Sequence, residues 1–146
     1  MVDPKLFYIG GQWTPSAVAR THAVENPATE AVIAQISLGS EADVDRAVEA
    51  ARAAFESFSQ TSVAERVALL ERIVAEYNRR TPDLARAVTD EMGAPAWLAR
   101  DAQVPLGAVH FTQAIEALKN YPFERQFGTT LVVREPVGVC ALITPW

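Results

Sequence analysis

Short apolar runs separated by turn residues open the chain. Residues 6–9 and 12–13 flank two consecutive glycines, which supply the positive φ angles that tight hairpin turns need. A second pair of runs, residues 21–24 and 31–36, is joined by a segment that contains Asn-Pro, a turn initiator. In the last of these runs the two faces alternate and one is the more apolar, as in a half-buried strand. The pattern predicts an opening of antiparallel β-hairpins.

The spacing of apolar residues then changes from two to three and four, which is the period of an amphipathic helix. Ser40 with Asp43, and Ser62 with Glu65, are capping-box patterns that mark two helix starts. We expect a helix of about four turns after the first box and a second helix after the other. Their predicted core faces are Val44, Val48, Ala51, Phe55 and Phe58, and Val63, Val67, Leu70, Val74 and Tyr77.

Two more helices are expected before residue 121. Thr81-Pro82 fits the N-cap and first position of a third helix, and Gly93 fits the left-handed residue that follows a helix end. Pro95 starts a longer fourth helix that runs to residue 118 or nearby. We expect Pro105, and the glycine two residues later, to bend or weaken this helix near its middle.

Two further apolar runs end the sequence. Residues 129–133 are strongly strand-forming. Pro136 separates them from residues 137–143, which carry no charge and no polar side chain except the thiol of Cys140. Such a run, rich in β-branched residues, predicts a strand buried on both faces. A thiol inside it is expected to pack as a small hydrophobe rather than to act as a nucleophile.

The composition is that of a globular protein. The net charge is −5 at pH 7, and the arginines are dispersed, which argues against nucleic acid as a partner because phosphate binding needs a basic face. The single cysteine allows no internal disulfide and fits a reducing compartment. No apolar stretch reaches the length of a membrane span, and the first residues lack the apolar region of a signal peptide. We therefore expect a soluble, cytoplasmic protein with no membrane partner.

Common nucleotide and metal motifs are missing from the sequence. It contains neither a G-x-G-x-x-G fingerprint nor a P-loop, and His22 and His110 have no Cys or His at ligand spacing. The better candidate site is the end of the last predicted strand. Thr144, Pro145 and Trp146 would lie at its carboxyl edge, where open α/β sheets bind ligands. From periodicity alone, Trp146 fits a cap on the core as well as a ligand contact.

Several stretches together resemble the first third of an aldehyde dehydrogenase of the NAD(P)-dependent superfamily. They occur along the whole chain in the same order as in the family. The resemblance rests on all of them together and not on any single stretch. The stretches are YIGGQW at 8–13, ENPAT at 25–29, DVDRAV at 43–48, AARAAF at 50–55, ER at 65–66, EMGAP at 91–95, EPVGV at 135–139 and ITPW at 143–146.

The resemblance implies an α/β fold, of which this chain supplies the N-terminal part of a Rossmann-like NAD(P)-binding domain. Residues 1–126 would form the β-hairpins and four helices. Residues 127–136 would form the protruding β arm that holds homodimers or homotetramers together. Residues 137–146 would be the first strand of the nucleotide-binding sheet with its cofactor loop, and the catalytic domain would be absent. The family does not use the usual glycine fingerprint at this strand.

The resemblance also implies chemistry. In the family a cysteine thiolate attacks the aldehyde, a hydride passes to the nicotinamide, and a glutamate acts as general base in thioester hydrolysis, while an asparagine amide stabilises the oxyanion. No position of this chain matches those three residues, and Cys140 does not match the nucleophile's motif. Some members also bind a structural monovalent cation. The implied cofactor contacts are Ile143, Thr144, Pro145 and Trp146, and the implied cation ligands are the main-chain oxygens of Val24 and Glu25 with Glu91.

We therefore expect oxidation of an aldehyde to a carboxylic acid with NAD or NADP in a longer protein, and no activity of the 146-residue chain alone. Two alternatives stay open. The chain could be a non-catalytic interaction or oligomerisation module derived from such a protein, which would bury its last strand against a partner. It could also be a small cysteine-dependent enzyme, which would need an exposed, reactive thiol at Cys140.

Overall fold

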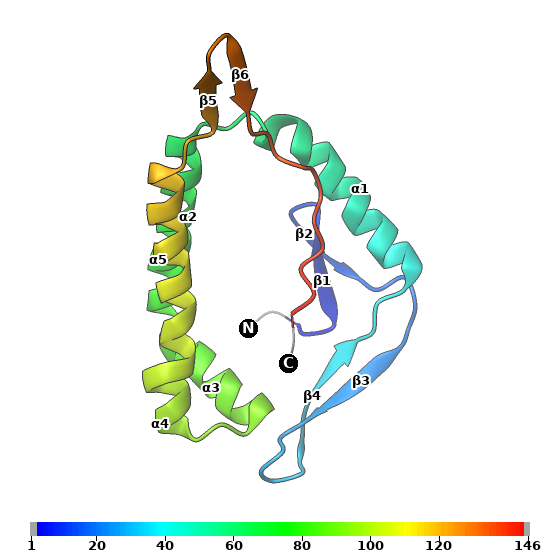
Figure 1. Cartoon of the computed structure of the whole chain (residues 1–146). Coiled ribbons are helices and arrows are strands. Elements are labelled where there is room, and N and C mark those ends of the chain that lie inside the picture. Colours follow the sequence, from blue (N-terminus) through cyan, green and yellow to red (C-terminus); the bar gives the residue numbers. More distant parts are fainter. Residues whose placement is uncertain (1–2, 145–146) are drawn as a thin grey trace. The chain divides into compact units, whose positions relative to one another are not determined.

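The structure, a computed structural model, describes residues 3–144 and divides into two compact units. The first, called here the hairpin unit, comprises residues up to 22, residues 36–61 and residues from 122 onward, and the second, the helical unit, comprises residues 23–35 and 62–121. Figure 1 shows the elements along the chain. Across residues 3–144, no helix combines the length and apolar character needed to cross a membrane.

The hairpin unit begins with β1 (Leu6–Ile9) and β2 (Gln12–Pro15). The two strands are antiparallel, with Tyr8 opposite Trp13, and the centroids of these two rings lie 5.0 Å apart. The two glycines of the turn have φ angles of 59° and 80°, a region that residues with a Cβ rarely adopt. The prediction of a hairpin here is confirmed.

The second predicted pair of strands is also present. β3 (Thr21–Glu25) pairs with β4 (Val32–Ser37) in a two-stranded sheet. In the connection, the side-chain oxygen of Asn26 accepts hydrogen bonds from the backbone N–H groups of Ala28 at 2.9 Å and Thr29 at 3.2 Å. Such a pattern is an Asx turn, so the Asn-Pro signal correctly marks where the chain reverses.

The helix of the hairpin unit, α1 (Glu41–Phe58), begins at the first predicted capping box. Asp43 accepts hydrogen bonds from the backbone N–H and the hydroxyl of Ser40, at 2.9 and 2.7 Å. Its carboxylate also accepts from the Ser16 hydroxyl at 3.0 Å, the Ala17 N–H at 2.9 Å and the Arg46 guanidinium. Only 4% of Asp43 is exposed. One buried carboxylate therefore fastens the segment after β2 to the start of α1.

The hydrogen bonds to Asp43 set its ionisation. Burial acts to raise the pKa of Asp43, but hydrogen bonds from Ala17, Ser40 and Arg46 outweigh it, so the pKa lies well below its usual range. A carboxyl whose folded pKa is depressed contributes stability that is complete above its unfolded pKa, about 4, and is lost as the pH falls through the folded value. The contribution of Asp43 is therefore fully present at neutral pH and decreases only in acid.

Replacing Asp43 by asparagine is expected to loosen the segment after β2. The Ala17 amide donates directly to this carboxylate, so its hydrogen-exchange protection reports the contact. We expect protection at pH 7 to fall about 10-fold in Asp43→Asn, because a charge-assisted hydrogen bond becomes a neutral one. In the unsubstituted protein it should fall only as the pH drops below about 4. Equal protection of Ala17 in both proteins at pH 7 would contradict this account.

The helical unit is built on α2 (Val63–Arg79) and α5 (Val104–Asn120), which lie side by side (Figure 1). The second capping box is confirmed. The Ser62 hydroxyl accepts from the Glu65 N–H at 3.2 Å, and the Glu65 carboxylate accepts from the Ser62 N–H at 2.7 Å. The core of this unit combines small and branched residues: Ala85, Ala94, Ala99 and Val104, with Tyr77, Leu84 and Val88 packed against them.

The third helix, α3 (Thr81–Met92), follows α2 almost directly. The prediction that Thr81 is its N-cap is wrong by one residue. The Leu84 N–H bonds to the carbonyl of Arg80 at 3.0 Å, so Arg80 takes the capping position and Thr81 is already helical. Gly93 ends the helix with a φ of 74°, which confirms its prediction as the left-handed residue.

The expected fourth helix is present and runs without a break from Ala96 to Asn120, but it is not α-helical throughout. It consists of α4 (Ala96–Leu98), a π-helical segment η1 (Ala99–Gln103), and α5. In a regular α-helix the ring of Pro105 would clash with the carbonyl four residues earlier, at Asp101. That carbonyl belongs to η1, where the wider turn relieves the clash. The predicted weakening at Pro105 is therefore confirmed, and it takes the form of a π-turn.

A last hairpin consists of β5 (Glu124–Phe127) and β6 (Thr130–Val133), paired antiparallel. Gly128 lies in its turn with a φ of 57°. The sequence predicts β6 but not β5, because the run Glu-Arg-Gln offers no alternation of apolar and polar residues. All residues of both strands are exposed.

Residues 137–143 do not form the predicted strand. They have no regular secondary structure, and Val137, Leu142 and Ile143 are 93%, 91% and 93% exposed. The prediction of burial on both faces is therefore wrong for this chain, and Cys140 is exposed rather than packed. A strand needs ladder hydrogen bonds to a neighbour, and none of the two-stranded sheets described within residues 3–144 includes this segment.

Candidate cation and cofactor sites

The predicted cation ligands lie at the ends of two elements of the chain. Val24 and Glu25 are the last residues of β3, and Glu91 lies in the last turn of α3. The next turns bring these elements together. A Cβ added to Gly93 would lie 2.8 Å from Cγ of Pro27, so the Asn-Pro turn after β3 is in close contact with the end of α3.

A cation bound here would draw on oxygen atoms of both elements. The end of a helix presents carbonyl groups without intrahelical partners, and its dipole favours positive charge. Val24 is half-buried, whereas Glu25 and Glu91 are exposed. Carbonyl and carboxylate oxygens suit hard cations. Residues 3–144 contain no cluster of three or more His, Cys, Asp or Glu side chains that could hold a metal ion, so a cation here would depend on main-chain oxygens.

The predicted cofactor contacts are partly described. Ile143 and Thr144 lie in the exposed segment after β6, and Pro145 and Trp146 lie outside the described residues. Ile143 is 93% exposed. An exposed isoleucine forms no pocket by itself, so the assignment of these four residues to a cofactor site stays a prediction.

The exposed thiol of Cys140 meets one condition for a nucleophile. Its sulfur lies 3.8 Å from the carbonyl oxygen of Gly138, two residues earlier. A carbonyl can accept a hydrogen bond from a thiol, but it does not generate the thiolate that reacts. This contact therefore gives Cys140 no activating base.

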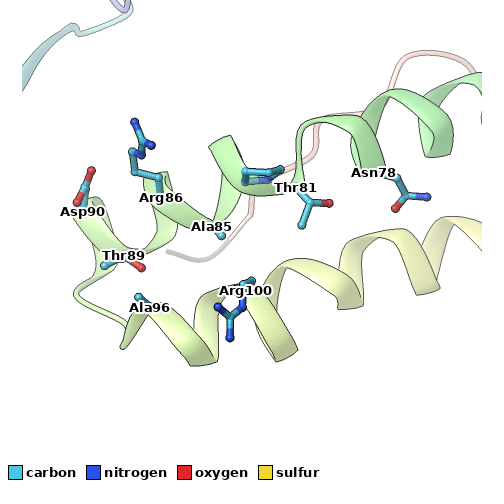
Figure 2. A pocket seen from close by; sticks show the side chains of 9 residues that line it. Asn78, Thr81, Ala85, Arg86, Thr89, Asp90, Ala96 and Arg100 are labelled. Carbon is cyan, nitrogen blue, oxygen red and sulfur yellow. The ribbon is translucent and has the colours of Figure 1, made fainter.

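Sequence reasoning missed a groove on the helical unit. It has a volume of about 640 Å³ and lies between α3 and the α4–η1 segment, with Ala85 and Ala96 between the helices (Figure 2). Arg100, which lines the groove, donates two hydrogen bonds to its neighbour Asp101, at 2.6 and 2.8 Å. The pair lowers the pKa of Asp101 and raises that of Arg100. The groove is bordered by charged side chains as well as by small apolar ones, since Arg86 and Asp90 of α3 also line it.

Comparison with known proteins decides the family. Residues 13–146 match the sequence model of the aldehyde dehydrogenase family. This chain belongs to that family. The resemblance carried by the motifs from YIGGQW to ITPW is thereby confirmed, and so is the α/β fold class of an aldehyde dehydrogenase N-terminal part.

One curated relative within the aldehyde dehydrogenases is a 3-succinoylsemialdehyde-pyridine dehydrogenase from a Pseudomonas species. It is 50% identical over 147 residues, which cover 100% of this chain and 31% of the relative. The chain therefore spans less than a third of the length of this relative. The functions of the rest of such a protein depend on residues that are not among these 146.

Two solved aldehyde dehydrogenases show how closely the fold agrees. A mutant of aldehyde dehydrogenase C from Pseudomonas syringae, in complex with NAD+ and octanal, is 48% identical with a TM-score of 0.97, covering 99% of this chain and 30% of that one. An aldehyde dehydrogenase from Bartonella henselae is 36% identical with a TM-score of 0.84, covering 89% of this chain and 28% of that one. The hairpins and helices described above are thus those of the family.

Proposed function

We propose that these 146 residues are the N-terminal portion of an enzyme that oxidises an aldehyde to a carboxylic acid with NAD or NADP. The observation that carries the proposal is the likeness to the Pseudomonas syringae protein, at 48% identity and a TM-score of 0.97. That protein was solved with NAD+ and octanal. The likeness covers 30% of its length, so the cysteine nucleophile, the base and the oxyanion amide would be supplied by a longer polypeptide.

Residues 1–126 would form the N-terminal part of the cofactor-binding domain of this enzyme. Residues 137–146 would join its sheet as the first strand. The exposure of Val137, Leu142 and Ile143 supports this role, because a contiguous apolar surface in a soluble protein is normally covered. A bound nicotinamide cofactor supplies the hydride acceptor. Its contacts in this chain would be Ile143, Thr144, Pro145 and Trp146.

The proposal also includes a structural cation site and a cytoplasmic location. The main-chain oxygens of Val24 and Glu25, with the carboxylate of Glu91, would hold a structural monovalent cation. The close contact of Pro27 with Gly93 supports this grouping. The single cysteine supports a reducing compartment such as the cytoplasm.

The natural-length protein provides the direct test of the enzyme. It is mixed with NAD+ or NADP+ and an aldehyde, with octanal as the first probe, and the reduced cofactor is measured. We expect reduction that requires both the aldehyde and one of the two cofactors. A natural-length protein that binds neither cofactor would overturn the proposal.

The β5–β6 hairpin overlaps the predicted arm, residues 127–136, and its apolar side chains support a role in homodimers or homotetramers. Leu131, Val132 and Val133 are 52%, 43% and 49% exposed. A charge placed among them would be buried at a subunit interface, which is strongly unfavourable. We expect Val132→Asp to shift the natural-length protein to smaller assemblies, measured by sedimentation velocity.

A matched control separates the arm from a general effect of an added charge. Val32 in β4 is 57% exposed, so Val32→Asp makes the same substitution at another exposed strand residue. We expect the assembly size to stay unchanged in this variant. Equal behaviour of the two variants would argue against the arm.

The exposed hairpin equally favours a second candidate, a non-catalytic oligomerisation module of the same origin. The intact mass of the natural polypeptide distinguishes the two. A mass several times larger than the 15.9 kDa of this chain supports the enzyme. A mass equal to it supports the module, since the cell would then make a protein without the catalytic residues.

A further inference from the structure

Tyr77 reaches from α2 to the first residue of α5. Its hydroxyl donates a hydrogen bond to the carbonyl oxygen of Val104 at 2.8 Å. The residue is half-buried, and it packs against the core of the helical unit. This hydrogen bond therefore joins two helices that are neighbours in space but distant in sequence.

Gly107 lies in the first turn of α5, against the Tyr77 ring. A Cβ at this position would lie 2.3 Å from the Tyr77 hydroxyl oxygen and 2.6 Å from Cζ. Contacts under 3.0 Å are essentially never seen for real Cβ atoms, so the ring fits here only because residue 107 has no side chain. Glycine is otherwise a poor helix former. The close approach of Tyr77 explains its presence in α5.

The hydrogen bond from Tyr77 falls where the helix is least regular. The π-turn η1 directly precedes α5, and Pro105 has no N–H to donate. The side-chain oxygen of Gln103 is buried and has no hydrogen-bond partner among the described residues. This part of the helix therefore has a weaker hydrogen-bond ladder of its own than a regular helix, and the bond from Tyr77 adds a tie to α2 at the same place.

We infer that Tyr77 and Gly107 act as a pair that positions the η1–α5 junction against α2. Tyr77 supplies the hydrogen bond, and Gly107 supplies the space that the ring needs. The junction carries the apolar side chains of Leu106 and Val109, which are 53% and 46% exposed. The pair thus also sets where that apolar surface lies. The inference concerns the conformation of this chain and does not depend on the proposed function.

The test is a double-mutant cycle on the natural-length protein, read by hydrogen exchange of the amides of Val104, Leu106, residue 107 and Ala108. Gly107→Ala alone is expected to raise their exchange about 10-fold or more, because the new methyl group displaces the Tyr77 ring. Tyr77→Leu removes the three nearest atoms that this methyl group would meet, which are all in the outer part of the Tyr77 side chain. When Gly107→Ala is added to Tyr77→Leu, we expect exchange to slow instead, because alanine favours a helix over glycine.

The effect of Gly107→Ala on exchange thus changes sign when Tyr77 is replaced. A glycine that did not make room for the Tyr77 ring would show the same effect in both backgrounds. Gly107→Ala that slows exchange both alone and together with Tyr77→Leu would overturn the inference. Tyr77→Phe provides a second measurement should Gly107→Ala fail to fold. It keeps the ring and removes only the donor, so exchange at the junction should rise several-fold. Tyr8→Phe, the same change at an exposed tyrosine of β1, should leave the junction unchanged, and an equal response of both would also overturn the inference.

Discussion

The 146-residue chain, purified by itself, is expected to form no reduced NAD or NADP from an aldehyde, whereas the natural-length protein forms it. The proposed reaction needs a cysteine thiolate, a general base and an oxyanion donor. Cys140 is the single cysteine, and its sulfur contacts the Gly138 carbonyl rather than a base. Loss of the nucleophile alone costs about 10⁴-fold or more in kcat. The activity of the isolated chain should therefore fall below detection.

The measurement compares cofactor reduction by equal molar amounts of the two proteins with the same aldehyde. Cys140→Ser in the natural-length protein is the control, and we expect its activity to match that of the unsubstituted protein. Oxidation by the isolated chain would refute the prediction. Loss of activity in Cys140→Ser would assign the nucleophile to Cys140 and favour the small cysteine-dependent enzyme.

Elements with local causes are the ones that the sequence predicts well. The Ser62–Glu65 box needs only residues three apart, and both of its reciprocal hydrogen bonds form. Gly93 and the paired glycines between β1 and β2 take positive φ angles, which side chains with a Cβ disfavour. In each case the chemistry of a few neighbouring residues decides the backbone, so no knowledge of the rest of the fold is needed.

Elements that depend on distant partners are predicted less well. β5 contains Glu124, Arg125 and Gln126 and becomes a strand because β6 pairs with it, not because its own residues favour one. Residues 137–143 show the opposite case. They have the composition of a buried strand, yet Val137 and Ile143 are 93% exposed, because pairing and cover come from other parts of a sheet.

The candidate cation site falls between these two cases. The sequence identifies the Asn-Pro turn and the end of α3 as separate signals. Their approach, with Pro27 Cγ 2.8 Å from where a Cβ of Gly93 would lie, is a long-range contact that no local pattern contains. The groove beside Ala85 and Ala96 was also missed, because it depends on how α3 packs against the α4–η1 segment and not on the sequence pattern of either element.

Gly93→Ala is expected to destabilise the contact between the Asn-Pro turn and α3 by about 2–5 kcal/mol. A left-handed alanine costs about 1–2 kcal/mol, and Gly93 has a φ of 74°. The added methyl group would also collide with Pro27, and overpacking of this kind typically costs about 1–3 kcal/mol. The loss is measured as the free energy of local opening, from hydrogen exchange of the last amides of α3.

Gly128→Ala separates the two contributions. Gly128 has a φ of 57°, but a Cβ there would meet nothing within 4 Å. Its substitution should therefore carry the cost of the left-handed backbone alone, about 1–2 kcal/mol for opening of the β5–β6 turn. Equal losses in the two variants would mean that Pro27 yields to the methyl group without cost.

If the turn and the helix end also hold a cation, added Na+ or K+ should raise hydrogen-exchange protection at the end of α3 in the unsubstituted protein. The effect should be smaller in Gly93→Ala, because a shifted turn would no longer align the oxygens of Val24 and Glu25 with Glu91.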